Sequence, residues 1–150
     1  MLVAAGIAVE VVPGVSSSIA APAAAGIPVT MRGLASGVTI VTAHQDPDKQ
    51  SGLDWDALAR TGTTLVVLMG AARARFVSQR LIAGGMRPDM PVAVITSATN
   101  PDQLIDRTTL AQLGEMPVCN PSTIVIGEVA ALDVTAAASL AALAAGGETS

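Results

Sequence analysis

Four short runs of apolar and β-branched residues recur along the chain and leave room for helices between them. They cover residues 38–42, 64–69, 91–96 and 123–129. Branched side chains pack well on a pleated surface, and a short apolar run suits a strand that is buried on both faces. Strands that alternate with helical segments predict an α/β fold, in which helices cover a central sheet.

One segment between these runs has a clear helical pattern. Residues 73–83 place Ala74, Val77 and Leu81 three and four positions apart, which puts their side chains on one face of a helix. We expect that face to pack on the sheet, and Gly84 marks the expected end of the helix.

Shorter elements complete this expected domain. Asp54 can accept a hydrogen bond from a backbone N–H group as the N-cap of a short helix at 55–60. A second short helix is expected at 110–115. Residues 103–108 alternate and carry charge, which is typical of an edge strand.

The first part of the chain predicts a strand, a tight turn and a helix in succession. Residues 9–12 favour a strand, Pro13-Gly14 favours a turn, and the serines at 16–18 lie where a helix would begin, with an exit strand at 27–30. Free N–H groups at a helix start favour a bound carboxylate or phosphate. A structural turn in which a serine caps the helix explains the same residues equally well.

Composition excludes several classes of protein. The net charge of −4 and the scarcity of aromatic residues, with one Phe, one Trp and no Tyr, argue against a nucleic-acid partner. Cys119 is the single cysteine, so an internal disulfide is excluded and a reducing cytoplasm is the expected location. With one histidine as well, no usual zinc site is expected. No apolar run approaches the roughly 18 residues that span a bilayer, so no membrane partner is expected.

Two blocks of sequence are more specific than their local chemistry. They read Val-Val-Pro-Gly-Val-Ser-Ser at 11–17 and Ala-Gly-Ile-Pro-Val-Thr-Met-Arg-Gly at 25–33. Both closely resemble the tetrapyrrole methylases, and within that family the enzymes that methylate uroporphyrinogen III. The resemblance extends to about residue 132 and so covers nearly all of the chain.

This resemblance implies two α/β domains that hold S-adenosylmethionine between them in a folded conformation. Residues 1–32 are then the last strand and helix of an N-terminal domain, and 33–37 are a flexible linker. Residues 38–134 are the C-terminal α/β domain, and 135–150 are an alanine-rich tail that we expect to fray. The family's upstream glycine-rich loops have no counterpart here, so we expect the chain to be the C-terminal part of such an enzyme.

The resemblance also assigns cofactor contacts to Ser16, Ser17, Met69 and Ala98. The two serines offer hydroxyl and backbone N–H groups to the methionine carboxylate. Met69 is flexible and apolar and can pack against adenine or the sulfonium. Ala98 is small enough for its backbone to approach the adenine edge. Without the resemblance, Met69 and Ala98 are more simply explained as core residues.

Arg32 is the expected substrate-binding residue, together with Met69. A guanidinium binds carboxylates with two hydrogen bonds, and uroporphyrinogen III carries a rim of them. The family's Thr-His-Arg-Gly block reads Thr-Met-Arg-Gly at 30–33, so the usual histidine is absent. His44 matches a family block too, but a capping or packing role is the stronger interpretation. No catalytic acid or base is assigned.

The implied reaction is methylation of two pyrrole carbons of uroporphyrinogen III to give precorrin-2 and S-adenosylhomocysteine, on the way to sirohaem or cobalamin. The resemblance also implies a homodimer. Two alternatives stay open. One is a truncated α/β module without catalysis that binds the cofactor weakly or contributes dimer contacts, and the other is a related corrin-ring methylase.

Overall fold

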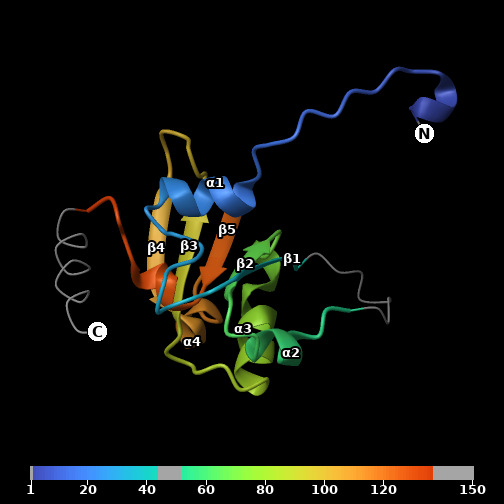
Figure 1. Cartoon of the computed structure of the whole chain (residues 1–150). Coiled ribbons are helices and arrows are strands. Elements are labelled where there is room, and N and C mark those ends of the chain that lie inside the picture. The colour runs from blue at the N-terminus through green and yellow to red at the C-terminus, as the bar shows by residue number, and fades with distance from the viewer. Residues whose placement is uncertain (1, 44–51, 137–150) are drawn as a thin grey trace.

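The chain forms a mixed five-stranded sheet, as a computed structural model that describes residues 2–43 and 52–136 shows (Figure 1). The strands are β1 (Val38–Thr42), β2 (Thr64–Leu68), β3 (Pro91–Thr96), β4 (Leu104–Thr109) and β5 (Ser122–Ile126). Their order across the sheet is β1-β2-β5-β3-β4. β1 pairs with β2 in parallel, and the other three pairs are antiparallel. β1, β2 and β3 therefore run in one direction, and β4 and β5 run in the other.

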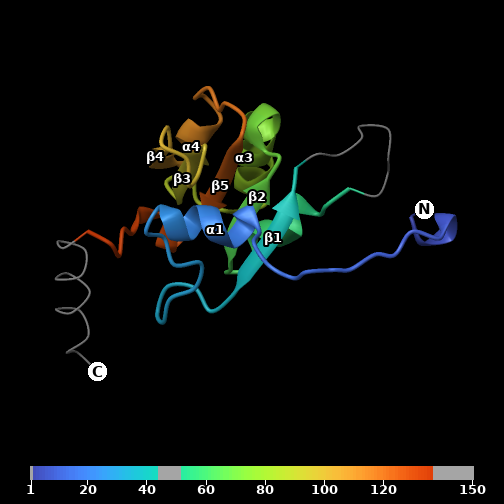
Figure 2. The ribbon, with the colours of Figure 1, turned by 90° about the horizontal axis from the view of Figure 1, so that it is seen from above.

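Helices cover both faces of this sheet, so the described residues form three layers. Figure 2 shows α1 on one side of the strands and α3 and α4 on the other. The helices are α1 (Ser17–Ala24), α2 (Trp55–Ala59), α3 (Ala74–Ala83) and α4 (Leu110–Leu113), with short 3-10 turns η1 (Val3–Ala5), η2 (Ala71–Arg73) and η3 (Glu128–Ala131). No helix in the described part of the chain is both long and apolar enough to cross a membrane.

Alternation along the central strands divides the core into two clusters. Val92 and Val94 of β3 pack with α2, α3 and α4 in one cluster, whereas Ala93 and Ile95 pack with α1 and η3 in the other, which we call the α1 cluster. All four side chains are at most 1% exposed. Side chains alternate across a strand, so a strand buried on both faces must be apolar throughout, as this run is.

The predicted α/β class is confirmed, and most expected elements form close to their predicted bounds. The Asp54 side chain accepts from the Ala57 N–H at 2.9 Å and caps α2. Val77 and Leu81 of α3 are fully buried. β4 lies at the edge of the sheet, as its charge and alternation predicted.

Two expected strands in the first part of the chain were wrong. Residues 9–12 form no strand, and Val11 and Val12 are 82% and 83% exposed. β-branched residues favour a strand only when a neighbouring strand pairs with them and a surface buries them, and the described residues provide neither here. Residues 27–30 form no strand either, although Ile27 is buried against the α1 cluster.

The segment that follows α1 packs on the sheet instead of standing apart from it. Met31 and Ala35 form an isolated β-bridge, and Ala35, inside the expected flexible linker at 33–37, is 7% exposed. The expected division of the chain into domains stays a prediction. His44, most of the expected loop after it and the tail beyond residue 136 lie outside the described residues.

Candidate functional site

A cavity of about 360 Å³ lies at the edge of the sheet where β2 and β3 end and β5 begins. Its lining residues come from α1 and from the three segments at this edge: Ser17, Leu68, Met69, Ile95, Ser97, Ala98, Asn100, Asn120, Pro121, Ser122 and Thr123. β2 and β3 point the same way across the intervening β5, so their carboxyl ends lie on either side of its first residues. Open α/β sheets bind ligands at the carboxyl ends of their strands, and this volume suits a small molecule.

The amino-terminal end of α1 forms one wall of the cavity. Ser16 is the N-cap of this helix, and its hydroxyl accepts from the Ser18 N–H at 3.3 Å and lies 2.8 Å from the Ser18 hydroxyl. Ser17, the first helical residue, lines the cavity, and among the described residues nothing accepts a hydrogen bond from its N–H group. A free N–H at a helix start is a donor for an anionic group.

Met69 forms a second wall, directly after β2. Its φ of +53° lies in the left-handed region, and the residue is 57% exposed although its side chain is large and apolar. That region is costly for any residue with a Cβ and is enriched at functional sites. The turn therefore presents a thioether toward open space instead of burying it in the core.

The loop after β3 forms the third wall and repeats the same backbone feature. Ser97 has a φ of +50° and Thr99 a φ of +69°. Ala98 lies between them and is half-buried against the α1 cluster. Its small side chain leaves the backbone of this loop accessible at the cavity.

The start of β5 supplies a floor that the sequence analysis did not predict. Asn120 and Ser122 add an amide and a hydroxyl to the lining, and the Ser122 hydroxyl lies 2.8 Å from that of Thr96 in β3. The Asn-Pro dipeptide at 120–121 signals a turn. That signal could have located a loop, but it does not place the loop between β2 and β3.

The structure thus brings together three of the predicted site residues and leaves two apart. Ser17, Met69 and Ala98 line one cavity. Ser16 does not line it, and its hydroxyl caps the helix. Arg32 is exposed in the turn between Met31 and Ala35 and does not line it either.

The turn that carries Arg32 lies toward the opposite end of β2. Its neighbours Leu34 and Ala35 line a different cavity together with Thr63 and Thr64, at the start of that strand. The two cavities therefore lie at opposite ends of β2, which has five residues and advances about 3.3 Å per residue.

Among the described residues, no ionisable side chain lines the cavity at the carboxyl edge. The described lining consists of hydroxyl, amide and backbone groups together with apolar surface, so these groups can orient a ligand but supply no strong acid or base. The groups with displaced pKa values lie elsewhere. The pKa of Arg87 is raised by its hydrogen bond to Glu128, and the pKa of Asp133 is lowered by hydrogen bonds from Thr135.

A family model and curated relatives all identify this chain with the same family of enzymes. The family model of the tetrapyrrole (corrin/porphyrin) methylases matches residues 1–114. The chain is 47% identical over 134 residues to an S-adenosyl-L-methionine-dependent uroporphyrinogen III methyltransferase of Methanosarcina barkeri, covering 86% of this chain and 52% of that protein. It is 47% identical over 128 residues to a uroporphyrinogen-III C-methyltransferase of Pseudomonas aeruginosa, covering 83% of this chain and 51% of that protein.

Solved structures agree in fold. A uroporphyrin-III C-methyl transferase from Thermus thermophilus, complexed with S-adenosylhomocysteine, superposes with a TM-score of 0.76 at 31% identity, over 89% of this chain and 60% of that one. A cobalt precorrin-4 methyltransferase superposes with a TM-score of 0.78 at 28% identity, over 87% and 56%. The chain spans about half the length of the curated relatives described above. The expected correspondence to the C-terminal part of such enzymes stays a prediction.

Proposed function

The chain belongs to the tetrapyrrole (corrin/porphyrin) methylases, and from that premise we propose that it contributes a cofactor site to the C-methylation of uroporphyrinogen III by S-adenosylmethionine. The products would be precorrin-2 and S-adenosylhomocysteine. The observation that carries this proposal is the convergence of Ser17, Met69 and Ala98 on one cavity. These residues lie far apart in the sequence, and each was expected to contact the cofactor.

The chemistry of the lining fits this cofactor. The free N–H of Ser17 suits the methionine carboxylate, because a helix start carries a partial positive charge. Met69 offers a polarizable apolar surface for adenine or for the methyl-bearing sulfur. The backbone beside Ala98, with Asn100 nearby, suits the polar edge of adenine.

S-adenosylmethionine supplies an activated methyl group, so the residues of this chain have to orient it and exclude water. Holding two reacting groups in the right orientation removes a large share of the activation barrier of such transfers. None of the described residues that line the cavity is suited to remove a proton from the methylated ring, so we assign the acid or base to no residue.

Several finer assignments belong to the same proposal. Arg32 would bind a substrate carboxylate, and Met69 would contact the substrate as well as the cofactor. A homodimer in the cytoplasm is the proposed form of the enzyme. Arg32 lies outside the cavity, so its assignment to substrate binding rests on the ability of a guanidinium to bind carboxylates.

Two alternatives have a specific observation in their favour. Because the chain spans about half of its relatives, it can act as a module without catalysis that binds the cofactor weakly or contributes dimer contacts. Because it also superposes on a cobalt precorrin-4 methyltransferase, a later corrinoid is the alternative substrate.

Titration calorimetry with S-adenosylhomocysteine tests the proposal. We expect saturable binding that Met69→Glu weakens about tenfold or more, which corresponds to about 1.4 kcal/mol. Ile40→Thr is the matched control, because Ile40 is an exposed apolar residue of β1 that lies outside the cavity lining. Equal binding by all three proteins, or none by the unmodified chain, would refute this assignment of the site. Weak binding would favour the module over the complete cofactor site.

A further inference from the structure

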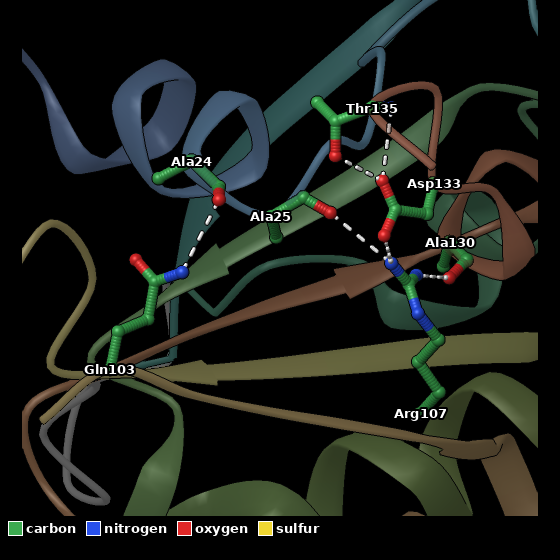
Figure 3. Close-up of polar contacts among 7 residues, drawn as sticks. All are labelled: Ala24, Ala25, Gln103, Arg107, Ala130, Asp133 and Thr135. Atoms are coloured by element: carbon green, nitrogen blue, oxygen red, sulfur yellow. Dashed lines mark hydrogen bonds and ion pairs between the residues drawn. The ribbon is translucent and has the colours of Figure 1, made fainter. Parts of the chain in front are cut away.

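One amide side chain links two walls of the cavity without lining it. Gln103 lies directly before β4, at the end of the loop that follows β3. Its Oε1 atom accepts from the Thr99 N–H at 2.7 Å, and its Nε2 atom donates to the Ala24 carbonyl at 3.2 Å (Figure 3 shows the second contact). The first contact holds the loop, and the second holds the last residue of α1.

Neither contact partner lines the cavity, but each belongs to a segment that does. Thr99 lies between Ala98 and Asn100, which line it. Ala24 lies at the end of α1, and Ser17 at the start of this helix lines the cavity from the opposite side. An eight-residue helix is about 12 Å long and is held together by its own backbone hydrogen bonds, so we expect a restraint at its end to restrain its start as well.

The chemistry of the two partners makes glutamine specific for this position. A backbone N–H needs an acceptor and a backbone carbonyl needs a donor, and one amide group supplies both. Glutamate would keep the contact with Thr99, lose the contact with Ala24 and place a negative charge at a helix end that disfavours it. Leucine would lose both contacts. The φ of +69° at Thr99 also needs such external support to persist.

Arg107 anchors the same helix end but does not contact the loop. Its guanidinium donates to the Ala25 carbonyl at 3.1 Å and to the Ala130 carbonyl at 2.6 Å, and its Nη2 atom lies 4.0 Å from a carboxylate oxygen of Asp133 (Figure 3). Arg107 therefore provides a comparison that separates anchoring of the helix from coupling of the two walls.

We propose that Gln103 is a positioning residue that sets the relative placement of the Ser97–Asn100 loop and the start of α1, and thereby the affinity of the cavity for its ligand. The ligand's identity as S-adenosylmethionine rests on the proposed function. The coupling itself does not, because it follows from the two hydrogen bonds.

Hydrogen exchange of individual amides in the ligand-free chain tests the coupling. In Gln103→Leu we expect exchange about fivefold faster or more at Thr99 and at Ala20 in α1, which is the size of effect that one lost hydrogen bond produces. In Gln103→Glu the exchange rate should rise at Ala20 and stay unchanged at Thr99. We expect the same pattern in Arg107→Met. The buried Val125 amide of β5 is the reference. An unchanged rate at Thr99 in Gln103→Leu, or equal acceleration at Val125, would overturn the proposal.

Calorimetry with S-adenosylhomocysteine then tests the effect on affinity, at a temperature where every variant is folded. We expect about tenfold weaker binding by Gln103→Leu, and less than additive losses when it is combined with Ser17→Ala, because Gln103→Leu also loosens the wall that carries Ser17. Additive losses, or unchanged affinity in Gln103→Leu, would overturn the role in binding. If the unmodified chain does not bind, the proposed function fails, while the exchange rates still decide whether Gln103 couples the walls.

Discussion

Met69 and Ser97 occupy equivalent places in the fold, because each is the first residue after a strand and each has a φ near +50°. β2 and β3 are separated by β5, so the two residues lie on either side of one strand and line one cavity. Two left-handed residues at such matched positions keep both strands from continuing and turn both backbones at the cavity. Residues held in this region cluster at binding sites.

Removing the side chain at one of these positions should separate stability from binding. Met69→Gly relieves a backbone conformation that costs about 1–2 kcal/mol for a residue with a Cβ, against about 0.5–1 kcal/mol of added chain entropy. We therefore expect a free energy of unfolding that is unchanged or up to about 1.5 kcal/mol higher, with weaker binding of S-adenosylhomocysteine. Chemical denaturation and calorimetry measure the two effects. Met69→Val is the comparison, and it should be less stable than the unmodified chain; equal stability of the three would contradict this account.

The two serines at the start of α1 should behave differently from each other. Ser16→Ala removes the N-cap and should lower the free energy of unfolding by about 1 kcal/mol. Ser17→Ala leaves the cap in place, so its stability should change by less than about 0.5 kcal/mol. It also keeps the backbone N–H, so its loss of ligand affinity should be modest and should reflect the missing hydroxyl alone. Denaturant titrations of both variants provide the check. A larger loss of stability in Ser17→Ala than in Ser16→Ala would show that the capping residue is misassigned.

The packing of α3 on the sheet should dominate stability. Leu81 is fully buried, so Leu81→Ala removes buried apolar surface and leaves a cavity, at a cost of about 2–5 kcal/mol. Leu104→Ala is the control, since Leu104 is 62% exposed on β4 and its removal should cost less than about 0.5 kcal/mol. Thermal unfolding of both variants would measure the difference. Similar melting temperatures would argue against the layered core.

Acid should weaken the contact between Asp133 and Thr135. The Thr135 hydroxyl and N–H both donate to one oxygen of Asp133, at 2.5 and 3.0 Å, and these hydrogen bonds lower the pKa of this carboxyl below its ordinary value of 3.8. A lowered pKa contributes stability that is complete above pH 3.8 and is lost as the pH falls through the lower folded value. Thr135→Ala removes the hydroxyl, so its deficit in unfolding free energy should shrink below pH 3.8. A deficit that is constant with pH would contradict this.

The sequence predicted the sheet well because its signals are local. Residues 91–96 are apolar on both faces, which is enough to identify a buried central strand. Residues 9–12 have the same propensity, yet they form no strand because pairing is a tertiary property. The site was predicted in part. Ser17, Met69 and Ala98 came from family resemblance, whereas Asn120 and Ser122 depend on β5 lying between β2 and β3, which no local pattern specifies.

The central claim is that one ligand contacts α1, the end of β2 and the loop after β3 together. Titration of the isotope-labelled chain with S-adenosylhomocysteine, followed by amide chemical shifts, measures this directly. We expect the largest shifts at Ser17, Met69 and Ala98, and we expect them to saturate with one common dissociation constant. Shifts confined to residues outside the cavity, or distinct dissociation constants for the three amides, would contradict it.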